Sequence, residues 1–481
     1  MKKELHWTSR TGDFCARCTA LLCFLIWAAA LVQAGRSGHG QALAAGLLLC
    51  LPAGWLMFRA LSRLKRLGPA KVLTLLTLLC LVCKLAWVLW AVIEPEMDYK
   101  TFWDSAQALT TQEVLQGGRY IALFPHIFGY AWFLSLLIGM FGPLSLLAPV
   151  TNALLSVCGG LLLFFLVNRR FGFETGCGAL VLWTLCPSQT IYNMFVLSEP
   201  LYTTLLLGVL ALIALFADRW KDWGPVRQAA AGVGTGLLLA AVNFTRPVGA
   251  IILIALGLWL ALIHADGWRN PPFRRSWLLF CAALVAVYAL AGGLGRQYIA
   301  ARLGEEPSAT TGYNILVGLN PDSGGKWNWT DSDALTQANT ADRSAQEVQE
   351  EMLELAKDRL FSGQVDLLAL LPQKLATFLG TDDACTGYAV SVLRHRNELS
   401  FLCNAFWYGA IGLSLIALLH VVRTGERSSV QLCILYCIGL TMAQMLVEVA
   451  GRYHYSLWIV LAVLAAWGAR LLPVPGGKTK E

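Results

Sequence analysis

Twelve apolar runs, each close to 20 residues long, constrain what this chain can fold into more than any other feature. They lie near residues 15–34, 41–58, 71–93, 146–167, 174–192, 199–217, 227–243, 247–264, 276–294, 399–421, 429–449 and 455–472. A helix of about 20 apolar residues crosses the hydrocarbon core of a bilayer. Only 14% of the residues are charged and 57% are hydrophobic, whereas roughly a quarter of the residues of a soluble domain are charged. The sequence therefore predicts an all-α polytopic membrane protein with about 12 transmembrane helices.

A thirteenth apolar segment, Phe124–Gly142, is long enough to cross but contains Pro125, Gly129 and Gly139. Short cytoplasmic loops are rich in Lys and Arg, so the charges bear on whether this segment crosses. With twelve spans and both termini in the cytoplasm, the cytoplasmic loops hold the basic groups at 59–66, 169–170, 219–221, 269–275 and 423–427. A thirteenth crossing would move every group after Arg66 to the outer side. We therefore expect a juxtamembrane helix at the outer interface, and an ordinary span that breaks the charge rule is the alternative.

This topology assigns three parts of the chain to the outer face: the loop 94–145, the turns NFTRP and GRYHY, and the polar stretch 295–398. In that stretch, residues 311–333 are rich in Gly, Asn and Asp and are interpreted as turns. Residues 344–364 have the apolar spacing of a helix, and 365–380 are expected to form an interfacial helix. We divide the chain into two additional N-terminal helices (1–70), a transmembrane catalytic core (71–294), a small extracytoplasmic domain (295–398) and C-terminal helices (399–481).

The formal charge of +7 does not indicate a nucleic-acid-binding protein, because Lys and Arg stand in small groups between apolar runs rather than in one patch. Nearly all of the fourteen cysteines fall inside apolar runs. Buried thiols are therefore expected rather than a disulfide framework.

Three acids are candidates for chemistry at the outer face. Asp98 follows the third apolar run and is surrounded in sequence by aromatic residues, a partly apolar setting that raises the basicity of a carboxylate. It is therefore a candidate catalytic base, with a solvated loop acid as the alternative. Asp104 lies in the same segment and is a substrate-binding candidate. Glu199 opens the sixth run, where it either interacts with the helix dipole or helps to bind a cation or a sugar.

Several basic and aromatic residues are candidates for holding a phosphate. Arg246 in NFTRPVG and Arg452 in EVAGRYHY face outward against the charge rule, and a guanidinium binds phosphate in bidentate geometry. Tyr453 adjoins Arg452; interfacial snorkelling is the alternative for both arginines. Lys84, inside the third run, needs either an acid on a neighbouring helix or a substrate phosphate as its partner. His126 either lines the same cavity or is a packed, hydrogen-bonded histidine.

In order and spacing, several segments resemble the GT-C membrane glycosyltransferases that use polyprenyl-phosphate-linked sugars, in particular the bacterial proteins similar to protein O-mannosyltransferases and aminoarabinose transferase. They are PEMDYKTFWDSAQAL, FPHIFGYAWFLSLLIGMFG, NRRFGFETGCGALVLWTLCPSQTIYNMFVLSEPLYTTLLL, TRPVGA and EVAGRYHY. The resemblance implies that Asp98 activates the acceptor hydroxyl and that Arg452 and Arg246 lie near the donor phosphate. It also implies inversion at the anomeric carbon. Two apolar runs precede the one leading to Asp98, whereas the family's acid usually follows the first run.

The sequence thus predicts a multi-pass plasma-membrane glycosyltransferase with an extracytoplasmic active site. It would move a hexose, mannose-like, from a polyprenyl-phosphate donor to a lipid, glycan or protein acceptor, and membrane lipids would surround it. A divalent cation is left open as a cofactor, and no residue is assigned to a metal. Two alternatives use the same features: a flippase or transporter of a lipid-linked saccharide, and a ligase or polymerase of surface polysaccharide.

Overall fold

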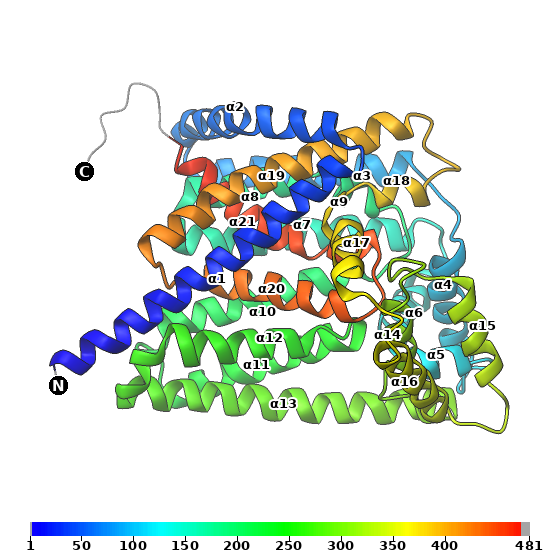
Figure 1. Cartoon of the computed structure of the whole chain (residues 1–481). Helices are drawn as coiled ribbons and strands as arrows, with labels where there is room; N and C mark the ends of the chain where they lie inside the picture. Colours follow the sequence, from blue (N-terminus) through cyan, green and yellow to red (C-terminus); the bar gives the residue numbers. More distant parts are fainter. Residues whose placement is uncertain (1, 473–481) are drawn as a thin grey trace.

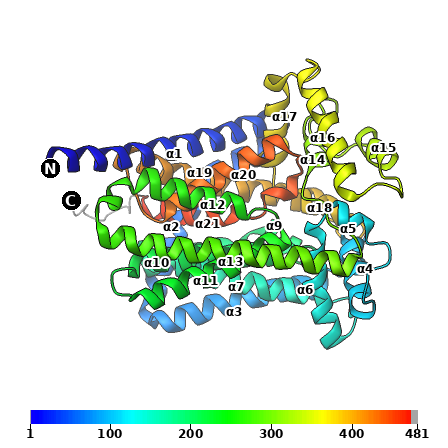
Figure 2. The same ribbon diagram turned by 90° about the horizontal axis from the view of Figure 1, so that it is seen from below.

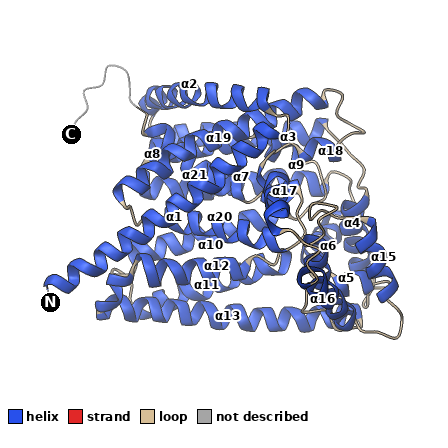
Figure 3. Ribbon diagram, viewed as in Figure 1, coloured by secondary structure: helices blue, strands red, loops and turns tan. Residues whose placement is uncertain are grey.

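The computed structural model describes residues 2–472, with side chains from Arg10 onward, and this part of the chain contains helices and loops but no β-strand (Figure 3). Within it, eight helices are long and apolar enough to cross a membrane: α1 (Lys2–Arg36), α2 (Gly40–Leu64), α3 (Pro69–Trp90), α7 (Leu147–Phe171), α10 (Glu199–Arg219), α11 (Pro225–Thr245), α13 (Pro271–Leu303) and α19 (Arg396–Thr424). Shorter apolar helices are α6 (His126–Phe141), α8 (Phe173–Leu185), α12 (Gly249–Leu258, continued by a π-helical turn to Ile263), α17 (Leu367–Leu379), α20 (Val430–Leu446) and α21 (Leu457–Arg470). The predicted all-α polytopic class is confirmed.

The remaining helices are short or polar. They are α4 (Met97–Thr111), α5 (Arg119–Leu123), α9 (Pro187–Tyr192), α14 (Gly312–Gly318), α15 (Trp329–Ala338), α16 (Ala345–Phe361) and α18 (Ala384–Tyr388), with 3₁₀ turns η1 (Lys65–Leu67), η3 (Ala265–Arg269) and η4 (Gly451–His454). The apolar helices run side by side, and α4, α5, α15 and α16 lie at the end of the bundle opposite the start of α1 (Figures 1 and 2). We call this the α4 end.

The other end of the bundle gathers the basic loops and is called the basic end. Ion pairs connect these loops: Lys65–Glu174 (3.2 Å), Arg169–Asp218 (2.8 Å), Arg170–Glu426 (2.7 Å), Arg427–Asp266 (3.1 Å) and Arg470–Glu174 (3.1 Å). These pairs join groups that the charge pattern assigns to one side of the membrane. A chain that crosses the membrane twelve times brings every second loop to the same side, and these basic loops lie together at one end of the bundle.

Helix α6 begins and ends at the α4 end. Near its start, the ring of Phe128 lies 5.9 Å from those of Phe244 and Tyr298, at the ends of α11 and α13. A Cβ on Gly129 would lie 1.9 Å from the carbonyl oxygen of Phe244, so only glycine allows this approach. Helix α4 packs along α6, and α7 begins at Leu147, five residues after α6 is capped by Gly142. This arrangement is the one expected of a juxtamembrane helix.

Two details of the sequence interpretation are wrong. The run 174–192 is not one helix, because Cys186 is extended (φ −60°, ψ 113°) before Pro187 and separates α8 from α9. A proline disfavours the helical conformation in the residue before it. The stretch 311–333, interpreted as turns, contains α14 and the start of α15, since burial of Leu316 and Val317 outweighs the local glycines.

A buried ion pair holds α15 against α16. Arg359 Nη2 donates to Asp331 Oδ1 at 2.7 Å, and the amides of Asn320 and Asn328 donate to Asp331 Oδ2 at 2.9 and 2.8 Å. Burial alone would raise the pKa of Asp331, but these hydrogen bonds lower it below its ordinary value. The Gly- and Asn-rich loop is therefore fixed by a satisfied carboxylate.

Candidate functional site

Asp98 and Arg452 form an ion pair at the α4 end although 354 positions separate them in the chain. Arg452 Nη2 donates to Asp98 Oδ2 at 2.5 Å. Asp98 lies in the first turn of α4, directly after Met97, which has φ +47° and is the one non-glycine residue with positive φ in residues 2–472. Such a conformation costs an L-residue about 1–2 kcal/mol. The chain accepts this strain where it turns into the helix that carries the acid.

Three tyrosine rings surround the Arg452 guanidinium. Its Cζ lies 5.8 Å from the ring centre of Tyr99 and 5.7 Å from those of Tyr388 and Tyr453. Cations are attracted to aromatic faces at such distances, so the rings hold the guanidinium in place. Arg452 Nε is buried without a hydrogen-bond acceptor. The side chain of Asp98 is 54% exposed and that of Arg452 16%, so the acid is open to a ligand and the arginine retains an unused donor.

A second acid–arginine pair also contacts the ring of Tyr453. Arg246 Nη2 donates to Glu199 Oε1 at 2.5 Å, and Glu199 is the first residue of α10. The Arg246 guanidinium lies 5.3 Å from the Tyr453 ring and 5.7 Å from that of Tyr202. One tyrosine thus contacts both arginines that the sequence singled out, and Glu199 has an arginine as its partner.

Glu448 is an acid of this region that sequence reasoning missed. It lies in the loop between α20 and η4, and Tyr453 Oη donates to its Oε1 at 3.3 Å. Burial raises the pKa of Glu448, and the nearby charge of Arg452 partly offsets this effect. Its position at the end of an apolar run, within EVAGRYHY, was the signal available in the sequence. We call Asp98, Glu199, Arg246, Glu448 and Arg452, with Tyr99, Tyr202, Tyr388 and Tyr453, the tyrosine–arginine cluster.

Three other candidates lie differently. Lys84 is fully buried in α3 and donates to the hydroxyl of Thr190 (2.6 Å) and the carbonyl of Trp183 (3.4 Å), so its protein partners are a hydroxyl and a backbone carbonyl rather than an acid. Asp104 is exposed on α4 and pairs with Lys100 at 2.6 Å. Neither belongs to the cluster.

His126 is half-buried at the start of α6, beside Phe124. Burial and the positive charges of Arg246 and Arg452 lower the pKa of His126 to about 3. It is therefore a neutral histidine at the edge of the cluster, able to exchange hydrogen bonds but not to supply positive charge.

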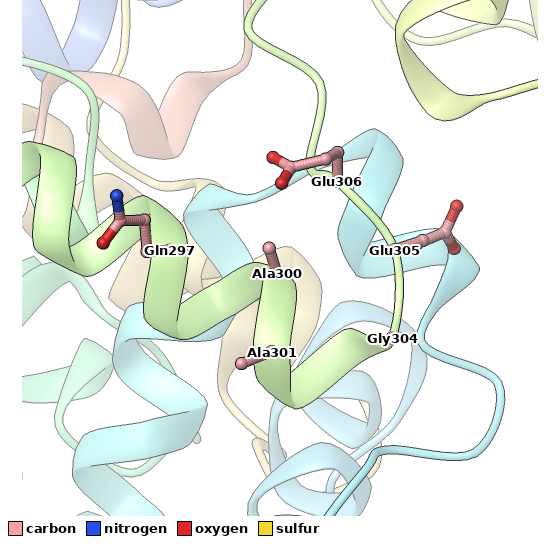
Figure 4. Close-up of a pocket in the computed structure, with 6 residues that line it drawn as sticks. All are labelled: Gln297, Ala300, Ala301, Gly304, Glu305 and Glu306. Atoms are coloured by element: carbon pink, nitrogen blue, oxygen red, sulfur yellow. The ribbon is translucent and has the colours of Figure 1, made fainter.

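A shallow depression of about 480 Å³ lies at the end of α13 and is separate from the cluster (Figure 4). It is lined by Gln297, Ala300, Ala301, Gly304, Glu305 and Glu306. Glu305 pairs with Arg119 at 2.7 Å, and Glu306 lies 3.8 Å from Arg296. With its acids already paired and no cluster residue in its lining, the depression is a surface feature of the α13 end.

Among the side chains that the structure describes, no three His, Cys, Asp or Glu are grouped so that they could hold a metal ion. The chemistry available in the cluster comes from two guanidinium groups, which bind anions, and from carboxylates, one of them open to solvent. Such a set can hold a phosphate and accept a proton next to it.

No protein-family model and no curated protein match this sequence. Solved structures similar to this chain include the following two. The archaeal oligosaccharyltransferase AglB from Archaeoglobus fulgidus, in complex with an inhibitory peptide and a dolichol-phosphate, has a TM-score of 0.45 and 14% identity over 84% of this chain and 50% of that one. ArnT from Cupriavidus metallidurans, bound to undecaprenyl phosphate, has a TM-score of 0.29 and 13% identity over 77% of this chain and 76% of that one.

This chain spans about half the length of the AglB chain. Similarity at these values assigns neither an activity nor a residue's role. Fold and site together define a helical polytopic membrane protein with a charged, tyrosine-lined cluster at one end of its bundle.

Proposed function

We propose that this protein is an inverting glycosyltransferase that moves a sugar from a polyprenyl-phosphate donor to an acceptor hydroxyl. The observation that carries the proposal is the direct contact between Asp98, an exposed carboxylate, and Arg452, a guanidinium with an unused donor. An enzyme that uses a lipid-phosphate sugar requires a base next to a phosphate-binding group, both at the end of apolar helices. The AglB complex with dolichol-phosphate and the ArnT complex with undecaprenyl phosphate are consistent with such a donor.

In the proposed reaction, Asp98 accepts the proton of the acceptor hydroxyl as its oxygen bonds to the anomeric carbon. The bond between that carbon and the phosphate oxygen breaks, and the electron pair leaves with polyprenyl phosphate. Arg452 stabilises the negative charge that develops on the leaving phosphate. Arg246, which is paired with Glu199, adds a second positive charge that acts on the same phosphate at longer range.

The Asp98–Arg452 pair implies an exchange of partners when the donor binds. A phosphate that reaches Arg452 competes with Asp98 for Nη2, and the displaced carboxylate is then free to accept a proton. Because Asp98 is half-exposed, its pairing with Arg452 stabilises the resting state by only about 0–1 kcal/mol. The exchange is therefore energetically accessible.

The proposed orientation places the basic end in the cytoplasm, as positively charged loops favour, and the cluster at the extracytoplasmic face of the plasma membrane. The acceptor is a lipid, glycan or protein, and the transferred sugar is a mannose-like hexose. The exposed position of Asp98 in the first turn of α4 leaves room for an acceptor of any of these classes to approach from the aqueous side.

The test is donor consumption by the purified protein in lipid nanodiscs. A panel of radiolabelled polyprenyl-phosphate hexoses is mixed with a cell-envelope extract as the source of acceptors. We expect release of polyprenyl phosphate together with movement of label into the extract. Binding of the donor without loss of label would contradict the proposal and favour a transporter of the same lipid.

A further inference from the structure

A buried histidine–carboxylate pair joins the η4 turn, which carries Arg452, to the helix bundle. His454, the last residue of η4, places Nε2 2.8 Å from Asp382 Oδ1 and Nδ1 2.5 Å from the carbonyl oxygen of Phe378. Both side chains of the pair are 1% exposed. The ring of His454 also stacks at 4.6 Å on that of Trp407. His454 therefore points into the helix bundle, away from the side chains of Arg452 and Tyr453.

Hydrogen bonding fixes the proton content of this pair. Both ring nitrogens of His454 face an acceptor oxygen, and a neutral imidazole carries only one N–H. Asp382 Oδ2 already accepts from Ser188 Oγ (2.5 Å) and Trp458 Nε1 (3.1 Å). The additional proton therefore lies between His454 Nε2 and Asp382 Oδ1. The pair as a whole is neutral, which makes its complete burial tolerable.

The pair joins several elements at one point. Asp382 lies in the loop between α17 and α18, Ser188 in α9, Trp458 in α21 and His454 in η4. The backbone amide of Asp382 donates to Asn404 Oδ1 of α19 at 2.8 Å. A turn of four residues, too short to be rigid by itself, is in this way tied to the helix bundle within two residues of Arg452.

We propose that His454 and Asp382 are positioning residues whose shared proton holds the η4 turn, so that Arg452 and Tyr453 stay in place to receive the donor phosphate. The identity of the ligand, a donor phosphate, rests on the proposed function. The rigidity of the η4 turn does not depend on it. Neither residue touches the phosphate, and both act through the backbone of η4. Loss of either one leaves an acceptor or donor buried without its partner and loosens the turn.

The experiment is hydrogen–deuterium exchange of the full chain in nanodiscs, followed on a peptide covering residues 450–456. In His454→Gln and Asp382→Asn we expect exchange of this segment to be about tenfold faster or more, since a local opening free energy controls it. Ser188→Ala, which removes one donor from Asp382 and keeps the ion pair, should give a smaller change in the same direction. The double variant should differ little from either single variant, because both break the same interaction.

Asp383→Asn is the matched control. Asp383 adjoins Asp382, but its carboxylate accepts from Ser400 and from Asn404 (3.0 Å) of α19 rather than from η4. Unchanged exchange at 450–456 in both pair variants, or an equal change in Asp383→Asn, would overturn the proposal. The exchange is measured without substrate, so its result stands whether or not the protein transfers sugars. If transfer is observed, the pair variants should raise the donor KM and lower kcat less than Arg452→Gln does, because they keep the guanidinium and loosen only the turn that holds it.

Discussion

Replacing Arg452 by Gln should remove the main phosphate ligand while keeping a side chain of similar reach. A charge-assisted hydrogen bond to a phosphate contributes about 1.5–3 kcal/mol, and each 1.4 kcal/mol corresponds to tenfold. Displacing Asp98 offsets at most about 1 kcal/mol of this, because the Asp98 side chain is 54% exposed. The tyrosine rings hold the guanidinium in place before the donor arrives, so little ordering cost is added. The net loss is about 0.5–3 kcal/mol, so we expect kcat/KM for the donor to fall about 2- to 150-fold.

The assay is steady-state release of polyprenyl phosphate at varied donor concentration, at fixed protein content of the nanodiscs. Arg296→Gln is the control, since Arg296 is an arginine of the same end of the bundle whose acid partner, Glu306, lies on the surface. It should change kcat/KM less than twofold, the scale of a surface pair. An Arg452→Gln protein with the kinetic constants of the native chain would refute the assignment of the phosphate site.

Three further predictions follow from the same structure. Met97→Gly should raise the free energy of unfolding by about 1 kcal/mol, because glycine adopts positive φ without strain and the Met97 side chain is 86% exposed. Met97→Val should lower the free energy of unfolding. Thermal unfolding in nanodiscs measures both effects. Asp331→Ala should destabilise the α15–α16 region by about 3–5 kcal/mol, since it leaves Arg359 without its buried partner. The pKa of Asp331 is lowered on folding, so its carboxylate stabilises the fold above its ordinary pKa, and this stabilisation is lost as pH falls through the lowered value. Proteolysis of the α15–α16 region should therefore increase on acidification in the native chain. In Asp331→Asn the increase should be smaller. An epitope inserted at 340–342 should be accessible from outside intact cells and one at 221–223 inaccessible; the opposite pattern would invert the proposed topology.

The positions of the apolar helices could be predicted because length and hydropathy are local properties of the sequence. Eleven of the twelve apolar runs are mostly helical without a break, and the run 174–192 is divided into α8 and α9. Helix α6 packs against α4 and against the ends of α11 and α13, as the charge pattern indicates. Pro187 is a local sequence signal for the break at Cys186, but it lies inside an apolar run that is long enough to be interpreted as one span. Helix α14 had no such signal, since its residues become helical through burial against α16 rather than through propensity.

The members of the cluster could be predicted only in part. Charge asymmetry placed Asp98, Arg246 and Arg452 on one face, but no local pattern pairs residues 354 positions apart. Tyr388 comes from a short helix with no distinguishing motif, and Glu448 was overlooked beside the more conspicuous Arg452. Lys84 had the chemistry of a phosphate ligand, but its depth in α3 leaves it with Thr190 and Trp183 as partners.

The most direct test of the account compares Asp98→Asn with Asp104→Asn in the donor-transfer assay. Both residues lie on α4 and both pair with a basic side chain, but only Asp98 belongs to the tyrosine–arginine cluster. The account predicts that Asp98→Asn lowers kcat by about 100-fold or more, the usual contribution of a general base, and that Asp104→Asn leaves it within about twofold. Equal activity in the two variants would contradict the assignment of Asp98 as the base.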